Sequence, residues 1–307
     1  MEKSNKFIDP MDTLFAPPPN RSKWETFSLF IYNPETNAFL GRTASSWAKI
    51  TVFYIIFYAC LAAMWAVCLW GLLQTVSEDE PTYLLDRSLI GSSPGLASRP
   101  MPPEGRESIL SFEYNGTQWH NSEWPQLFEE FLQEYENATG NDCTFNGANV
   151  LPCKVDIDNW KQCKPDGKRI NASCIYFKIN KVMGWTPKYY TDKTKLPSGM
   201  PQSLKDVITK INDTNQMKMV WLSCEGRHED DKQNIRNISF YPHQGFPAYY
   251  FPFQRQPNYK SPVVAVHFEN PVPGKTIDVE CRSWAQNIQQ DRKEQQGVLN
   301  FKLKFNK

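Results

Sequence analysis

Cysteine is the residue type whose number and spacing offer the most chemistry in this sequence. Six of the eight cysteines follow residue 140, whereas Cys60 and Cys68 lie in an apolar run. This density is typical of a disulfide framework made in an oxidising compartment, and six cysteines allow fifteen pairings. Zinc binding is the alternative, but the C-x₂-C spacing of zinc sites is absent. The candidate disulfide residues are Cys143, Cys153, Cys163, Cys174, Cys224 and Cys281.

Asparagine offers a second covalent chemistry. The N-x-Ser/Thr pattern accepts N-linked glycans, and it occurs five times after residue 110 and once earlier, at Asn20. Single sequons arise by chance, and we interpret Asn20 as one of these. Five sequons in the segment that also holds six cysteines indicate a domain made in the secretory pathway. We predict glycans at Asn115, Asn137, Asn171, Asn212 and Asn237.

Side chains for catalysis are sparse. Asp156 and Asp158 form a D-x-D pattern, which can hold a divalent ion in a type II glycosyltransferase, but no alternating strand–helix pattern provides a nucleotide crevice. The four histidines are scattered and no H-E-x-x-H motif occurs. A net charge of +1 gives no case for nucleic acid. We expect no catalytic residue, cofactor or metal.

One long uncharged run determines where the other segments of the chain lie. Residues 50–76 contain no Asp, Glu, Lys, Arg or His. As an α-helix this run would be about 40 Å long, more than the roughly 30 Å of a bilayer's hydrocarbon. A buried core helix and a cleaved signal peptide are the alternatives, and the run's length and its distance from the N-terminus argue against both. The sequence therefore predicts a single transmembrane helix.

The transmembrane helix divides the chain into two sides. Arg42 and Lys49 precede it and three acidic residues follow it, which favours a cytosolic N-terminus by the positive-inside rule. The predicted disulfides and glycans all lie on the other side. We predict a type II protein with a cytosolic arm (1–49), a signal-anchor helix (50–76), a linker (77–108) and a disulfide-bonded, glycosylated extracellular domain (109–307).

The extracellular part has the hydrophobic pattern of a mainly-β domain. Apolar and polar residues alternate over 175–179, 276–281 and 299–305, and two more buried strands are predicted at 219–224 and 263–268. An amphipathic helix is predicted from 122 to about 136 and a short one over 204–211. Several short strands with disulfides favour an antiparallel sandwich.

The residues just before the membrane helix resemble a known signature. They stand at the spacing of the N-terminal signature of sodium/potassium-transporting ATPase beta subunits, the X+/potassium ATPase beta subunit family. The resemblance continues over 178–187 and 245–268, and departs from a second, cysteine-containing signature at Trp160, Lys164 and Pro165. The residues that match the first signature are Phe27, Phe30, Tyr32, Asn33, Gly41, Arg42, Thr43 and Trp47.

This resemblance implies a fold and a function. The fold would be an immunoglobulin-like antiparallel sandwich with an added helix. The implied disulfides are Cys143–Cys153, Cys163–Cys174 and Cys224–Cys281. The implied function is that of a non-catalytic subunit of a plasma-membrane sodium/potassium pump. It would be needed for folding, delivery and stability of the catalytic alpha subunit and would modulate potassium affinity.

Two sets of aromatic residues are the predicted partner contacts. Tyr54 and Tyr58 share one helix face, and their hydroxyls would lack partners in lipid unless they snorkel or meet another helix. The resemblance implies that this helix belongs to the alpha subunit. The second set lies in an aromatic and proline-rich stretch that either braces a loop or forms an interface. Its members are Tyr249, Tyr250, Phe251 and Phe253.

Two further partners and one alternative function complete these expectations. Membrane lipid and a small regulatory membrane subunit are the further partners. The alternative is a cell-adhesion or junction glycoprotein that acts through the same extracellular domain. Co-purification with a large ATPase would separate the two functions.

Overall fold

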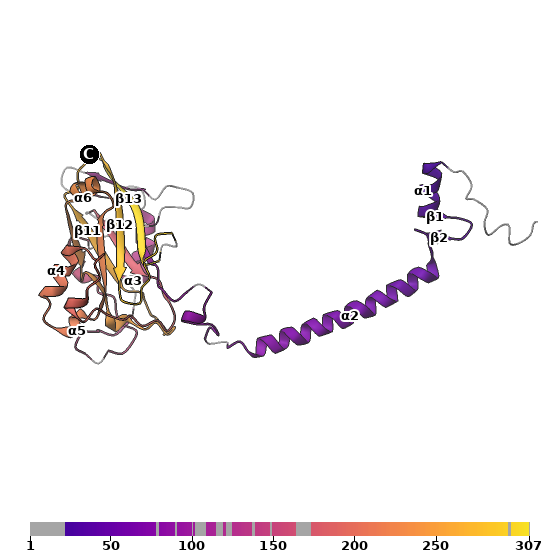
Figure 1. Cartoon of the computed structure of the whole chain (residues 1–307), viewed down its shortest axis with the longest axis horizontal. Coiled ribbons are helices and arrows are strands. Elements are labelled where there is room, and N and C mark those ends of the chain that lie inside the picture. The colour runs from indigo at the N-terminus through magenta and orange to yellow at the C-terminus, as the bar shows by residue number, and fades with distance from the viewer. Residues whose placement is uncertain are drawn as a thin grey trace, which may run out of the picture. The chain divides into compact units, whose positions relative to one another are not determined.

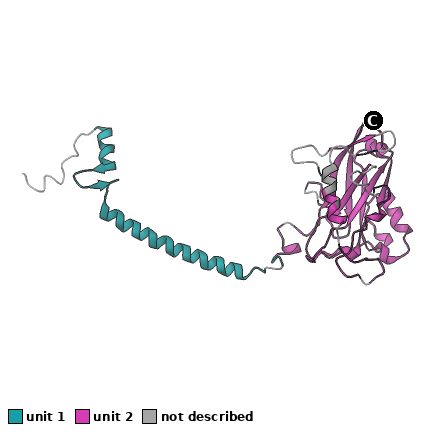
Figure 2. Cartoon of the chain, turned by 180° about the vertical axis from the view of Figure 1, so that it is seen from behind, with its two compact units in different colours: residues 1–82 teal, residues 83–307 magenta. Residues whose placement is uncertain are grey.

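We describe a computed structural model of the chain. It describes residues 22–77, 80–89, 91–99, 101, 109–114, 119–120, 125–136, 139–147, 149–163, 173–293 and 296–306. The chain forms two compact units, Met1–Thr82 and Tyr83–Lys307 (Figure 2). Each unit is described by itself.

The first unit is built around one long helix. A short helix and a small antiparallel sheet, in the order β1-β2-β3, precede it. Gly41 has a φ of 76°, which glycine adopts without strain, and this allows the tight turn into β3. The indole Nε1 of Trp47 donates to the carbonyl of Phe39 at 2.8 Å and ties the sheet to the long helix. The elements are α1 (Lys23–Ile31), β1 (Tyr32–Asn33), β2 (Ala38–Phe39), β3 (Arg42–Thr43) and α2 (Ala44–Gln74).

The long helix α2 is the predicted transmembrane helix. The helix begins at Ala44, six residues before the predicted start at residue 50. It ends at Gln74, two residues before the predicted end at residue 76. Its 31 residues have a mean hydropathy of 2.3 in their most apolar window, none of which is buried by the chain itself. Figure 1 shows α2 as one continuous helix. A helix this apolar needs lipid or another chain around it.

The described residues of the second unit form two β-sheets. The larger has the order β10-β8-β12-β13-β5-β6 and the smaller β4-β7-β11-β9. All pairings are antiparallel except that of β13 with β5, which is parallel and departs from the antiparallel pattern that we expected. The strands are β4 (Leu96–Arg99), β5 (Ile109–Tyr114), β6 (Trp119–His120), β7 (Cys174–Ile179), β8 (Met219–Gly226), β9 (Asn237–Tyr241), β10 (Gly245–Pro247), β11 (Val263–Glu269), β12 (Thr276–Trp284) and β13 (Val298–Asn306).

The main core lies between these two sheets. Alternate residues of each strand face it, as the period-two geometry of strands requires. Val266 and Phe268 of β11 reach it from the smaller sheet, and Ile277 and Val279 of β12 reach it from the larger one. The domain is therefore a β-sandwich, as predicted.

Helices form two further cores on the outer faces of the sandwich. On the smaller sheet, Phe131 of α3 (Pro125–Glu136) and Trp160 of the 3₁₀ helix η2 (Asp158–Cys163) pack on Tyr176. On the larger sheet, Trp221 and the helices α4 (Gln202–Lys210) and α5 (Thr214–Met217) form a separate cluster. Figure 1 shows α4 and α5 together at one side of the sheets. The short helices α6 (Glu229–Ile235), η1 (Leu85–Arg87), η3 (Lys193–Lys195) and η4 (Ala248–Tyr250) complete the fold.

Part of the predicted linker belongs to the sandwich. Strand β4 lies within 77–108 and pairs with β7 in register from Leu96↔Ile179 to Arg99↔Tyr176. The expectation of a linker came from the glycines, serines and prolines around β4, which obscured a four-residue edge strand. The second compact unit accordingly begins at Tyr83.

Candidate partner-binding surfaces and covalent sites

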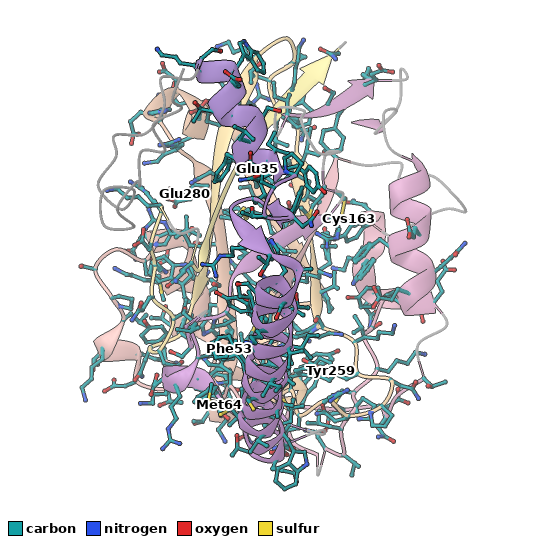
Figure 3. The ribbon with its side chains drawn as sticks, turned by 90° about the vertical axis from the view of Figure 1, so that its right-hand side faces the viewer. Glu35, Phe53, Met64, Cys163, Tyr259 and Glu280 are labelled. Carbon is teal, nitrogen blue, oxygen red and sulfur yellow. A yellow bond between two sulfur atoms is a disulfide. The ribbon has the colours of Figure 1, made fainter. Side chains whose placement is uncertain are left out.

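The aromatic face of α2 is the first predicted contact surface. The rings of Tyr54 and Tyr58 stack with centroids 6.0 Å apart, and those of Phe53 and Phe57 stack 6.2 Å apart. The two stacks also meet edge to face, since Phe53 lies 5.4 Å from Tyr54. Together the four rings form a preorganised aromatic patch on one side of the helix. Phe53 and Met64 on α2 are labelled in Figure 3.

This patch is uncovered by the described residues of its own unit. Tyr54 is 48% exposed and Tyr58 is 59% exposed. Within the described part of the chain, neither hydroxyl has a hydrogen-bond partner. A hydroxyl without a partner in hydrocarbon costs about 1–3 kcal/mol by mutational measures. The patch is therefore suited to a helix of another chain that offers polar groups at this depth.

The aromatic stretch of the second unit is held in place at Tyr250. Its side chain is only 5% exposed, and its hydroxyl donates to the carbonyl of Lys154 at 2.9 Å. The hydroxyl of Tyr259 donates to the carbonyl of Tyr250 at 3.1 Å. Burial raises the pKa of Tyr250, so its hydroxyl stays protonated at neutral pH. Tyr250 thus fits the bracing interpretation.

The other three aromatic residues of this stretch are half-buried. Phe251 meets Trp185 edge to face at 5.5 Å, and Phe253 packs on Tyr259 at 4.9 Å. Burial raises the pKa of Tyr249 to about 12. These residues keep an accessible part, which leaves them available to a partner while the domain fixes their orientation.

One cation in this region was missed by sequence reasoning. The ammonium group of Lys181 lies 5.7 Å from the Phe253 ring centre and 5.6 Å from that of Tyr259. Such a cation–π arrangement joins the loop of residue 181 to the aromatic stretch. No spacing rule would find it, because the residues are far apart in sequence.

The structure joins the six cysteines of the second unit in three disulfides. They are Cys143–Cys153, Cys163–Cys174 and Cys224–Cys281, the same pairs that the family resemblance implies. Cys224 and Cys281 are direct partners in the β8/β12 register, so this bond lies within one sheet and not between the two. Cys60 and Cys68 are free in α2.

Two of the five predicted glycan sites lie within the described residues. Asn212 is exposed between α4 and α5, and Asn237 is exposed at the first position of β9. Both can carry a glycan without loss of packing. Asn115, Asn137 and Asn171 lie outside the described residues.

The D-x-D pair has a local structural role. The carboxylate of Asp156 accepts the backbone N–H groups of Asp158 at 3.1 Å and Asn159 at 3.2 Å, and the side-chain amide of Asn159 at 2.6 Å. Asp156 therefore caps the turn into η2. No group of three or more metal-ligating side chains occurs among the described residues. Nothing in this geometry favours a glycosyltransferase.

An ion cluster on the larger sheet was not anticipated. Glu280 of β12 is 8% exposed and accepts from Arg292 at 2.9 Å and from Arg282 at 2.7 Å. Burial alone would raise the pKa of Glu280, but the hydrogen bonds from Arg292 and Arg282 lower it overall. The alternation of Glu280 and Arg282 along β12 indicates a polar face, but Arg292 comes from a loop.

Comparison with known proteins gives a consistent result along most of the chain. Residues 18–301 match the family described as sodium / potassium ATPase beta chain. The chain is 39% identical to sodium/potassium-transporting ATPase subunit beta-2 of Drosophila melanogaster, with 96% of this chain and 97% of the relative covered. It is 42% identical to subunit beta-1 of the same species (93% and 94% covered). It is 30% identical to subunit beta-2 of Homo sapiens (92% and 95% covered).

Proposed function

The chain belongs to the sodium/potassium ATPase beta chain family, a family of non-catalytic accessory subunits, and on that premise we propose that it assembles with the catalytic alpha subunit of a sodium/potassium pump in the plasma membrane. The observation that carries this proposal is the family match over residues 18–301. The apolar helix α2 supports it, because the described residues bury none of its most apolar window and such a helix needs apolar surroundings.

The proposed orientation is type II, with a cytosolic N-terminus. The disulfide-bonded sandwich and its sequons then lie outside the cell, where thiols are oxidised. In this position the sandwich covers the external loops of the alpha subunit. Tyr249, Phe251 and Phe253 are the candidate contacts, and Tyr250 fixes their geometry from within.

The proposed mechanism is differential contact. The aromatic patch of α2 packs against membrane helices of the alpha subunit, and the rest of α2 faces lipid or a small regulatory membrane subunit. An accessory chain that touches two pump conformations unequally shifts the equilibrium between them. This would change potassium affinity, and the same contacts would support folding and export of the alpha subunit.

The first prediction tests the α2 patch. Replacing both Tyr54 and Tyr58 with Leu removes two hydroxyls and two stacked rings but keeps the helix apolar. We expect less one-to-one recovery of the alpha subunit after mild detergent extraction, or a changed potassium dependence of pump activity. The matched control is V52L/I56L, a pair with the same spacing on another face of α2. Unchanged recovery and unchanged potassium dependence in Y54L/Y58L would contradict the contact.

The second prediction tests orientation. In sealed vesicles with the cytosolic face outward, protease should remove the N-terminal arm and leave the sandwich intact. Site-resolved mass spectrometry should find at least one of the five sequons occupied in protein from native membranes. Digestion of the sandwich from the cytosolic side would show that the type II orientation is wrong.

A further inference from the structure

A groove runs along two unpaired strand edges at one side of the sandwich. Its volume is about 600 Å³, within the range of roughly 300–1,000 Å³ for ligand sites. Four consecutive residues of β8, Ser223 to Gly226, line one wall, and four consecutive residues of β9, Asn237 to Phe240, line the other. Helices α4 and α6 contribute Ser203, Val207 and Lys232 to its ends.

Among the described residues, neither strand has another strand on the groove side, although α6 packs against the Gly226 end of β8. Strand β9 is the last strand of the smaller sheet and pairs only with β11. In the larger sheet, β10 pairs with β8 only over Met219–Trp221, so the second half of β8 has no strand beside it there. Unpaired edges of this kind invite association with other strands unless something covers them.

The sequon residue Asn237 lies on the wall of this groove. It is exposed, and it stands at the start of the edge strand β9. On the proposed extracellular location it receives a glycan from a lipid-linked diphosphate donor. The amide nitrogen of Asn237 bonds to the anomeric carbon of the first N-acetylglucosamine, the sugar–phosphate bond breaks, and the amide proton leaves with the diphosphate.

The groove lining suits a sugar chain. Ser203 and Gln244 offer a hydroxyl and an amide group for hydrogen bonds with sugar hydroxyls and N-acetyl groups. Val207 and Phe240 offer apolar surface for the C–H faces of the rings. The geometry points to this groove as the seat of the core sugars of the glycan on Asn237, which thereby covers the open edges of β8 and β9. This inference rests on the proposed extracellular orientation of the domain.

The test compares Asn237 with Asn212 in the same full-length protein. Asn212 is exposed in the loop after α4 and is not among the residues that line the groove. Peptide N-glycosidase can remove the Asn237 glycan only while the glycan is free of the groove. If the glycan in the groove is about tenfold more populated than the free glycan, its removal under native conditions is about tenfold slower. We expect slow release at Asn237, fast release at Asn212, and equal rates after denaturation.

A groove-filling variant provides the second measurement. Val207 is 37% exposed, so V207W adds an indole to the groove without entering the core. It should restore fast release at Asn237, and S203W, one helical turn earlier, should do the same. T209W adds the same ring to another face of α4 and should leave the slow release unchanged.

The outcomes separate this inference from the proposed function. The proposed binding of the glycan in the groove would be wrong if the glycans at the two sites were released at equal rates under native conditions. It would also be wrong if Asn212 carried a glycan and Asn237 did not. Neither result would contradict the type II orientation. No occupancy at any of the five sequons would overturn the orientation itself, and the inference with it.

Discussion

Glu280 lies at the centre of an ion cluster on the larger sheet. Its carboxylate is almost fully buried on the outer face of β12 and is held by Arg282 and Arg292. Removal of a charge from such a cluster leaves the partner charges poorly satisfied. Arg292 keeps 60% of its side chain exposed, so water compensates part of that loss.

We therefore expect Glu280→Gln to destabilise the domain by about 1–3 kcal/mol at pH 7. The folded-state pKa of Glu280 is lowered, so its stabilisation is present above the unfolded-state pKa of about 4.3 and is lost as pH falls through the folded-state value. Urea unfolding at pH 7 and in acid measures this. The difference between wild type and variant should shrink in acid.

The control for this prediction is Glu229→Gln. Glu229 pairs with Lys232 at 2.6 Å, but its side chain is 82% exposed. Surface pairs of this kind contribute about 0–1 kcal/mol. An equal loss of stability in the two variants would contradict the special role of Glu280.

At the residue scale, features that depend on local chemistry could be predicted from the sequence. Cysteine number and sequon positions need no knowledge of the fold, and the aromatic spacing of Tyr54 and Tyr58 follows from helix geometry alone. Sequence reasoning missed Lys181 and the cluster around Glu280, because both depend on side chains that only folding brings together. It also left the role of the aromatic stretch open until the burial of Tyr250 was known.

At the scale of the elements, the close packing of helix α6 against strand β8 depends on Gly226. A Cβ atom at Gly226 would lie 2.3 Å from the backbone nitrogen of Lys232 and 2.4 Å from the carbonyl carbon of Asp231. Backbone atoms cannot rotate away, so α6 would have to move. The absence of a side chain at Gly226 thus sets how closely the helix approaches the strand.

We expect Gly226→Ala to cost about 1–3 kcal/mol, as overpacking does in well-packed interiors. The matched change Gly199→Ala should be close to neutral, because a Cβ there would meet nothing within 4 Å. Thermal unfolding of both variants measures the difference. Similar unfolding temperatures for the two would contradict the close approach of α6 to β8.

The elements with a strong hydrophobic period could be predicted from the sequence. The predicted strands appear as β7, β8, β11, β12 and β13, and the predicted helices as α2, α3 and α4. Strands β6 and β10 have only two and three residues, too short for a period to be visible. Strand β5 does alternate, but its parallel partner lies at the other end of the domain, and local patterns carry no information about such pairing.

For the whole molecule, the disulfides stabilise only one of the two units. All three lie in Tyr83–Lys307, and α2 depends on its apolar surroundings. Cys224–Cys281 closes a loop of 57 residues and Cys143–Cys153 one of 10. In the chain-entropy model these loops correspond to about 4 and about 3 kcal/mol.

We therefore expect C224A/C281A to destabilise the sandwich more than C143A/C153A does. Urea unfolding under non-reducing conditions, followed by tryptophan fluorescence, ranks the two variants. Membrane integration should be unchanged in both, as alkaline extraction would measure. Release of either variant from the membrane by alkali would contradict the independence of the two units.

The parallel pairing of β5 with β13 has a consequence for biosynthesis. Residue 109 at the start of β5 is made 189 residues before residue 298 at the start of β13 (298 − 109). At about 5–20 residues per second, this delay is roughly 10–40 s. During that interval Leu110 and Phe112, which are buried in the folded domain, lack their β13 partners and stay accessible to chaperones. The larger sheet therefore cannot be completed until β13 has been synthesised.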